Sequence, residues 1–140
     1  MLFLCTGNSA RSILGEYLLR AKNPGRFETY SAGSNPKGHV HPLALRLLRE
    51  AYGIDAEDAR SKSWEEFQDV DFDFVITVCD NAKESCPVFP GQPTAIHWSL
   101  PDPADFQGPE EEHYARFQDV ARELDRRIER FSAAPTRTAP

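Results

Sequence analysis

A chain of 140 residues with 40% apolar and 27% charged residues has the size and composition of one globular domain with a hydrophobic core. No apolar run approaches the roughly 20 residues of a membrane-spanning helix, and no basic segment followed by an apolar stretch suggests a secretory signal. The formal net charge of −6 argues against binding to nucleic acid, which needs a basic surface for the phosphates. We therefore expect a cytoplasmic protein that binds neither membranes nor nucleic acids.

Strands and helices are predicted to alternate along the chain. Short apolar or β-branched runs that end at polar loops predict strands, and apolar residues at helical spacing predict helices. The expected strands cover residues 1–4, 27–32, 72–79 and 94–98. The expected helices cover residues 12–21, 42 to about 53, and 110 to about 131, with a short helical turn over 64–68 that Ser63 can cap.

This alternation predicts an α/β domain with a parallel sheet, because parallel strands need crossover connections that are usually helical. We expect one domain over residues 1–132 and a flexible tail over residues 133–140. Parallel sheets bind ligands beyond the carboxyl ends of their strands. Cys5, Cys79 and the loop after Trp98 follow such ends, so we expect their chemical groups to meet on one rim of the sheet.

The strongest functional signal is the segment 5–12, Cys-Thr-Gly-Asn-Ser-Ala-Arg-Ser, between the first expected strand and the first expected helix. A loop at this position can turn its backbone N–H groups toward an anion, with support from the helix dipole. Arg11 can close over a tetrahedral oxyanion with a bidentate fork. We expect the oxyanion to bind at Thr6, Gly7, Asn8, Ser9, Ala10, Arg11 and Ser12.

Cys5 lies at the base of this loop and is the candidate nucleophile. Gly7 permits a positive φ or a close approach of the anion, and Asn8 tolerates a left-handed turn. The local positive field should lower the pKa of Cys5, and a hydrogen bond from Ser12 would favour the thiolate further. The alternative is that Cys5 is a small buried residue at a strand end and that Arg11 is a surface charge.

The pattern Cys5, five residues, Arg11 and Ser12 on the first strand resembles the active-site loop of low-molecular-weight protein tyrosine phosphatases and of the related arsenate reductases. The resemblance extends in element order over roughly residues 1–131. It implies a three-layer α/β sandwich with a central four-stranded parallel sheet. The loop alone does not separate the two kinds of enzyme.

The segment 79–87, Cys-Asp-Asn-Ala-Lys-Glu-Ser-Cys-Pro, resembles the redox segment of thioredoxin-coupled arsenate reductases. The resemblance implies that oxidation passes from Cys5 to Cys79 and then to Cys86. It also implies that thioredoxin or an equivalent thiol reductant restores the thiols, so that no bound cofactor is needed. In a reducing cytosol, an odd count of three cysteines is more consistent with redox or catalytic use than with a structural framework.

If residues 80–86 were helical, Cys79 and Cys86 would lie about 10 Å apart. A disulfide tolerates a Cα separation of only up to about 7 Å, so its formation would unwind the segment. Pro87 removes a backbone N–H and makes the end of the segment easy to release, so we expect residues 80–90 to loop out. The alternatives are inert buried cysteines, or a zinc site with His39 or His97, although the gap of six residues matches no usual ligand spacing.

The loop over residues 98–104, which we call the acid loop, carries Asp102 before Pro103. In the resembling families an Asp at this position acts as general acid, and such a group typically contributes about 10²- to 10⁴-fold to the rate. The phosphatases usually continue with an aromatic residue that grips the substrate, whereas this chain has Ala104. That difference favours a small inorganic anion. The alternatives are a merely turn-forming Asp-Pro, or Asp105 or Asp80 as the acid.

Further residues match positions that support the anion loop in the resembling reductases, namely Asn8, Glu16, Ser31, Ser61 and Lys62. Some relatives hold a monovalent cation there with a carboxylate at the last position. Lys62 stands at that position here, and its ammonium can replace the ion, so we expect no bound metal. We also expect His41 to face solvent from its loop, and His113 to lie on the exposed side of the final helix.

These patterns together predict an arsenate reductase that acts in arsenic resistance as a monomer, with arsenate or another tetrahedral oxyanion and thioredoxin as partners. The residues expected to carry the chemistry are Cys5, Arg11, Cys79, Cys86 and Asp102. Two other functions stay open at this point. One is a low-molecular-weight protein tyrosine phosphatase, and the other is a redox-responsive oxyanion-binding module without turnover.

Overall fold

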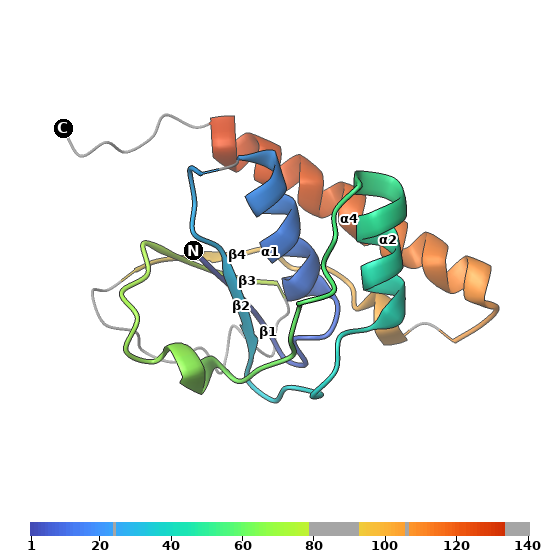
Figure 1. The fold of residues 1–140 in the computed structure, drawn as a ribbon, viewed down its shortest axis with the longest axis horizontal. Helices are drawn as coiled ribbons and strands as arrows, with labels where there is room; N and C mark the ends of the chain where they lie inside the picture. Colours follow the sequence, from blue (N-terminus) through green and yellow to red (C-terminus); the bar gives the residue numbers. More distant parts are fainter. Residues whose placement is uncertain (24, 79–92, 106, 134–140) are drawn as a thin grey trace.

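The computed structural model of the chain describes residues 1–23, 25–78, 93–105 and 107–133. Figure 1 shows the arrangement of its elements. In chain order these are β1 (Leu2–Cys5), α1 (Arg11–Lys22), β2 (Tyr30–Gly33), α2 (Pro42–Tyr52), η1 (Trp64–Phe67), β3 (Phe74–Thr77), β4 (Thr94–His97), η2 (Pro103–Asp105) and α4 (Glu110–Ala133).

The strands in the described part of the chain form one parallel sheet of four strands in the order β2-β1-β3-β4. This confirms the predicted α/β fold with a central parallel sheet. The strand β3 ends at Thr77, although the apolar pattern predicts a strand to residue 79. The chain leaves β1 toward β2 on one side and later returns to β3 on the other, so the crevice at the carboxyl ends of β1 and β3 is a topological switch point.

The two faces of the sheet are covered differently (Figure 1). Phe3 of β1 faces α1, since a Cβ built on Gly15 would lie 2.6 Å from its ring. Tyr30 of β2 instead packs against Phe67 and Phe72, with ring centroids 5.3 and 5.7 Å away. The sheet thus lies between a layer of α1, α2 and α4 and the segment that contains η1. This is the expected three-layer sandwich.

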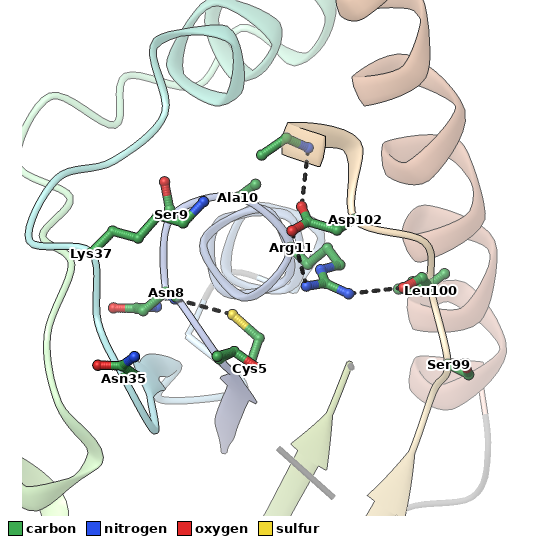
Figure 2. A pocket seen from close by; sticks show the side chains of 13 residues that line it. Cys5, Asn8, Ser9, Ala10, Arg11, Asn35, Lys37, Ser99, Leu100 and Asp102 are labelled. Atoms are coloured by element: carbon green, nitrogen blue, oxygen red, sulfur yellow. Dashed lines mark hydrogen bonds and ion pairs between the residues drawn. The ribbon is translucent and has the colours of Figure 1, made fainter. Parts of the chain in front are cut away.

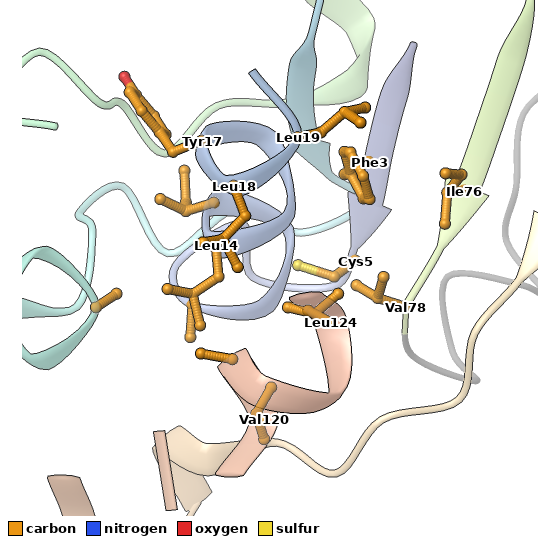
Figure 3. Packing of buried hydrophobic residues seen from close by; sticks show 14 of the residues in the cluster. Phe3, Cys5, Leu14, Tyr17, Leu18, Leu19, Ile76, Val78, Val120 and Leu124 are labelled. Atoms are coloured by element: carbon orange, nitrogen blue, oxygen red, sulfur yellow. The ribbon is translucent and has the colours of Figure 1, made fainter. Parts of the chain in front are cut away.

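The hydrophobic core joins α1 and α4 to the sheet, and Figure 3 shows Phe3 and Cys5 of β1 within it. The amphipathic pattern of α4 puts Phe117, Leu124 and Ile128 in this core, and each of these side chains has no exposed surface. None of the helices in the described ranges has the length and apolar character that a membrane crossing requires. The single domain over 1–132 stays a prediction, and the expected tail lies almost wholly outside the described residues.

Local signals explain where α2 begins and ends. Pro42 occupies its first turn, where a missing N–H costs nothing. The His41 ring caps the helix, because its Nδ1 accepts a hydrogen bond of 3.1 Å from the Leu43 N–H. Gly53 ends the helix with a φ of 66°, a conformation that glycine adopts without steric cost. The predicted turn at η1 is also present, with Ser63 Oγ accepting from the Glu65 N–H at 3.2 Å.

Candidate active site

A pocket of about 540 Å³ opens at the carboxyl end of β1 and at the N-terminus of α1. Figure 2 shows Cys5 in this pocket, with Asn8 on one side and Arg11 and Asp102 on the other. The pocket is lined by Cys5, Thr6, Gly7, Asn8, Ser9, Ala10, Arg11, Asn35, Lys37, Ser99, Leu100, Asp102 and Ala104. The structure thus brings together the anion loop, defined as residues 5–12, and the acid loop. Of the predicted site residues that the structure describes, only Ser12 is not part of the lining, because it lies behind Cys5.

The backbone carbonyls of the anion loop are turned away from the pocket. Four of them accept hydrogen bonds of 2.9–3.0 Å from the connection between β2 and α2, and the donors are the N–H groups of Ser34, Asn35, Lys37 and His41. Because these carbonyls accept hydrogen bonds on the outer side of the loop, the N–H groups between them can face the concave side. The helix α1 begins at Arg11 with no side-chain cap and no acidic residue in its first turn, so its positive end is open to an anion.

Asn8 holds the shape of the anion loop from inside the protein. Its φ of 45° is left-handed, as the sequence predicts, whereas Gly7 does not take a positive φ. The buried Asn8 side chain accepts from the Lys62 N–H at 2.8 Å and donates to Ser12 Oγ at 2.7 Å. Because Ser12 Oγ accepts this bond, its own hydrogen is available for the sulfur of Cys5, 2.9 Å away.

The Cys5 sulfur is almost fully buried, with 2% of the residue exposed. Burial raises the pKa of the Cys5 thiol above its ordinary value. The hydrogen bond from Ser12, the charge of Arg11 and the Asn8 N–H at 3.2 Å oppose this rise. The expected fall in pKa is therefore wrong, because desolvation outweighs the donors that the sequence pattern identifies.

Replacing Ser12 by alanine should raise the pKa of Cys5 further, because a hydrogen bond that favours the thiolate is lost. A higher pKa means less thiolate at a given pH, so the rate of alkylation by iodoacetamide should rise with pH only at more alkaline values. The rate is measured in a background with Cys79 and Cys86 changed to serine. Ser9→Ala is the matched control, because Ser9 Oγ is buried without a hydrogen-bond partner among the described residues. An unchanged profile in Ser12→Ala would contradict this role.

Arg11 and Asp102 lie next to each other on one side of the pocket (Figure 2). Arg11 Nη2 lies 3.5 Å from Asp102 Oδ2, and Arg11 Nη1 donates to the Leu100 carbonyl at 2.9 Å. The other carboxylate oxygen of Asp102 accepts from the Ala104 N–H at 3.0 Å. The guanidinium is thus tied to the acid loop, and an arriving oxyanion must compete with Asp102 for it.

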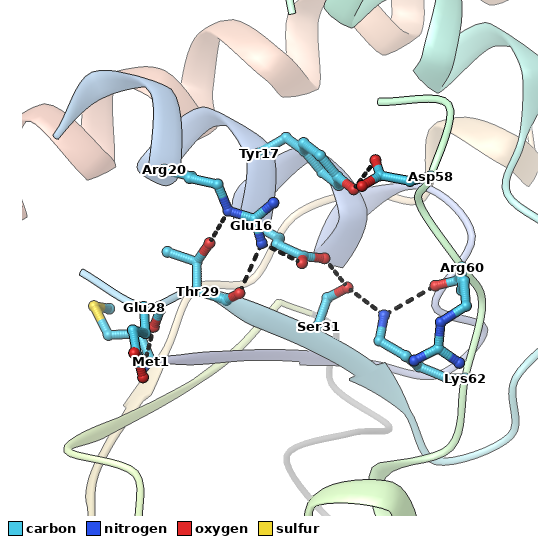
Figure 4. A network of polar contacts seen from close by, with 10 residues as sticks. All are labelled: Met1, Glu16, Tyr17, Arg20, Glu28, Thr29, Ser31, Asp58, Arg60 and Lys62. Carbon is cyan, nitrogen blue, oxygen red and sulfur yellow. Dashed lines mark hydrogen bonds and ion pairs between the residues drawn. The ribbon is translucent and has the colours of Figure 1, made fainter. Parts of the chain in front are cut away.

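A polar network lies beneath the anion loop (Figure 4). Ser31 Oγ donates to Glu16 Oε1 at 2.5 Å, and the buried Lys62 Nζ donates to Ser31 Oγ at 3.3 Å and to the Arg60 carbonyl at 2.9 Å. Arg20 Nη2 lies 2.8 Å from Glu16 Oε2. Burial lowers the pKa of Lys62, and the charge of Glu16 opposes that effect. The Lys62 amine thus lies beside Ser31, and the absence of a bound metal stays a prediction.

Replacing Lys62 by methionine should lower the free energy of unfolding by about 1–3 kcal/mol, because buried hydrogen-bond partners are left unsatisfied. Urea unfolding measures this difference, provided that the dependence of the unfolding free energy on urea concentration is the same in both proteins. Lys37→Met is the matched control and should stay within about 0.5 kcal/mol, since Lys37 is exposed. For the wild type, potassium and sodium chloride at equal ionic strength should give the same melting temperature. A specific gain with potassium would contradict the expectation that no metal binds.

Several residues of the site carry no motif in the sequence. Asn35 and Lys37 reach the pocket from the connection after β2, and Ser99 and Leu100 reach it from the acid loop. Gly33 permits the close packing of this connection, since a Cβ there would lie 2.5 Å from the Thr6 carbonyl oxygen. The small and polar residues over 33–36 predict a turn, but the sequence does not show that this turn packs against the anion loop.

The predicted redox cysteines, Cys79 and Cys86, lie outside the described residues, as does Asp80. The nearest described residue is Val78, whose N–H donates to the Leu4 carbonyl at 3.0 Å. This hydrogen bond therefore joins the two residues that precede Cys79 and Cys5 in the chain. In the described residues, no group of three or more His, Cys, Asp or Glu side chains is arranged to hold a metal ion.

Comparison with known proteins bears directly on this site. Residues 1–138 match the family described as low molecular weight phosphotyrosine protein phosphatase. The chain belongs to this family. Among curated relatives, the arsenate reductase of Bacillus licheniformis is 39% identical over 130 residues, which cover 93% of this chain and 92% of that protein. The expected family is thereby confirmed.

Two solved structures of arsenate reductases show the same fold. An arsenate reductase in the phosphate binding state has a TM-score of 0.72 and 27% identity, with 93% of each chain covered. A thioredoxin-dependent arsenate reductase of Corynebacterium glutamicum has a TM-score of 0.60 and 30% identity, with 91% of this chain and 60% of that chain covered. Within the phosphatase family, this chain is therefore similar to its arsenate-reducing members.

Proposed function

We propose that this protein is an arsenate reductase that converts arsenate to arsenite with electrons from its own thiols. The observation that carries the proposal is the buried Cys5 sulfur at the floor of an oxyanion pocket, held by Ser12 and by the Asn8 N–H. The similarity to arsenate reductases over 93% of the chain supports reduction rather than ester hydrolysis. Arsenic resistance is then the physiological role.

Burial raises the pKa of Cys5, so in the first step the thiol gives its proton to the bound arsenate and the resulting thiolate attacks arsenic. Arsenate is held by the inward N–H groups of the anion loop and by Arg11, which exchanges its partner Asp102 for the oxyanion. A sulfur–arsenic bond forms and an arsenic–oxygen bond breaks. Asp102 delivers the proton with which the oxygen leaves as water.

The next steps move two electrons from sulfur to arsenic. The Cys79 thiolate attacks the Cys5 sulfur, the sulfur–arsenic bond breaks, and its electron pair stays on arsenic, which leaves as arsenite. A Cys5–Cys79 disulfide remains. The Cys86 thiolate then attacks Cys79, which returns Cys5 as a thiolate and leaves a Cys79–Cys86 disulfide. The segment over residues 80–90 lies outside the described residues, and we expect it to loop out so that an external dithiol can reduce this disulfide.

Thioredoxin is the proposed reductant, because a protein dithiol supplies the two electrons that the Cys79–Cys86 disulfide needs. The thioredoxin-dependent relative supports this choice. A reducing cytosol is the compartment in which three free thiols and such a reductant coexist. We propose that the protein acts there as a monomer with no bound cofactor or metal.

A phosphatase is the second candidate, and the family as a whole favours it. The pocket favours a small inorganic anion instead. Among the described residues that line it none is aromatic, and Ala104 stands where the phosphatases usually grip the substrate ring. An aryl phosphate would therefore gain little from this side of the pocket.

Arsenite formation by the reduced wild-type protein tests the proposed function. Without an added reductant, each chain should form one arsenite and lose two thiols. With thioredoxin, thioredoxin reductase and NADPH, turnover should continue. Cys5→Ser is the control and should form none. Stoichiometric oxyanion binding without any arsenite would show a binding module, and steady hydrolysis of p-nitrophenyl phosphate without arsenite would show a phosphatase.

A further inference from the structure

His113 connects the final helix to the acid loop, contrary to the exposed position expected for it. It lies in the first turn of α4, where its backbone N–H donates to the Pro109 carbonyl at 3.0 Å. Its Nε2 lies 2.8 Å from the Pro103 carbonyl oxygen. A carbonyl only accepts, so Nε2 carries the hydrogen and donates it.

The position of Asp102 depends on this contact, because Pro103 is the next residue in the chain. Asp102 makes two contacts of its own, one with the Ala104 N–H and a longer one with Arg11. The contact with Arg11 must open when an oxyanion takes the guanidinium. The hydrogen bond from His113 then remains as a tie between the acid loop and a rigid helix.

The His113 ring is itself held in place. It packs against Phe117 and against the His41 ring, with centroids 5.3 Å away in both pairs. His41 also caps α2 through its Nδ1, and its backbone N–H donates to the Ser9 carbonyl at 2.9 Å. His41 therefore does not simply face solvent. The two rings join the anion loop, through Ser9, to the acid loop, through Pro103.

We propose that His113 is a positioning residue for this reaction, which fixes the general acid Asp102 over the oxyanion pocket through the Pro103 carbonyl. The proposal rests on the proposed arsenate reduction. His113 does not touch the substrate and acts only by holding the acid loop at the distance at which Asp102 reaches the leaving oxygen. A misplacement of about 1 Å can cost on the order of 10²-fold in rate.

Three variants test this role by the single-turnover rate of arsenite formation without added reductant. His113→Phe keeps a ring against His41 and Phe117 but removes the donor, and the rate should fall by about 10- to 10²-fold. His113→Gln restores an N–H at a similar reach, and most of the rate should return. His39→Phe is the matched control, an exposed histidine of the same region, and should react at the wild-type rate.

The deciding measurement repeats both His113 variants in an Asp102→Asn background. If His113 acts through Asp102, replacing His113 in that background should leave the single-turnover rate nearly unchanged. If replacing His113 lowered the rate by the same factor in both backgrounds, its role would be merely structural. A wild-type rate in His113→Phe would show that it has no role. Either result overturns the proposal. Melting temperatures identify folded variants, and His113→Met replaces His113→Phe if the latter does not fold. Failure of the proposed function would instead appear in the wild type, which would form no arsenite.

Discussion

Replacing Cys79 by serine should abolish arsenite release, even though Cys5 and the oxyanion pocket stay intact. Attack on arsenic consumes the Cys5 thiolate, but the thiol that attacks the Cys5 sulfur and leaves the electron pair on arsenic is then missing, because in the proposed relay Cys86 attacks only Cys79. Cys86→Ser should behave differently. It should release one arsenite per chain and then stop as a Cys5–Cys79 disulfide, because Cys5 is 2% exposed and a protein reductant cannot reach it.

The expectations for Cys79→Ser and Cys86→Ser are tested by measuring the arsenite formed and the free thiols left per chain. Reduced Cys86→Ser protein without reductant should give one arsenite, and a thioredoxin system should add few further cycles. Turnover of Cys86→Ser at the wild-type rate would remove Cys86 from the relay. Arsenite release from Cys79→Ser would contradict the attack of Cys79 on Cys5. Unchanged hydrolysis of p-nitrophenyl phosphate in both variants, without arsenite in the wild type, would favour the phosphatase.

The sequence predicted the fold well because its signals are local and agree with one another. The structure confirms the type of each element that these signals identify. They are the apolar run before Cys5, the β-branched run before Val78, and the helix boundaries at Pro42 and Gly53. Strand ends were less predictable. The apolar pattern continues past Thr77, but a strand ends where its neighbour stops pairing, and that depends on the tertiary structure.

The candidate site was predictable where its residues are adjacent in the chain. The anion loop over 5–12 is one continuous segment, so its motif could be read directly. Lys37 reaches the pocket, and His113 reaches the acid loop, only through tertiary packing, and the exposed position expected for His113 is wrong. The pKa of Cys5 was misjudged for the same reason, since the sequence shows the donors but not the depth of burial.

Replacing Asp102 by asparagine should separate catalysis from binding. The single-turnover rate of arsenite formation should fall by about 10²- to 10⁴-fold, because the leaving oxygen loses its proton donor. Binding should not weaken. Asp102 holds Arg11 through a contact of 3.5 Å, so a neutral asparagine releases the guanidinium and removes a negative charge beside the oxyanion. Phosphate, titrated by calorimetry as an unreactive oxyanion, should therefore bind equally or more tightly.

The control for Asp102→Asn is Asp105→Asn, which changes the competing carboxylate in the same short turn, η2. It should keep both the wild-type rate and the wild-type affinity for phosphate. A large loss of rate in Asp105→Asn with none in Asp102→Asn would assign the acid to Asp105. If Asp102→Asn weakened phosphate binding in proportion to its loss of rate, the carboxylate would be holding the pocket together. Arg11 would then need Asp102 as a support, and the exchange of Arg11 from carboxylate to oxyanion would not be part of the reaction.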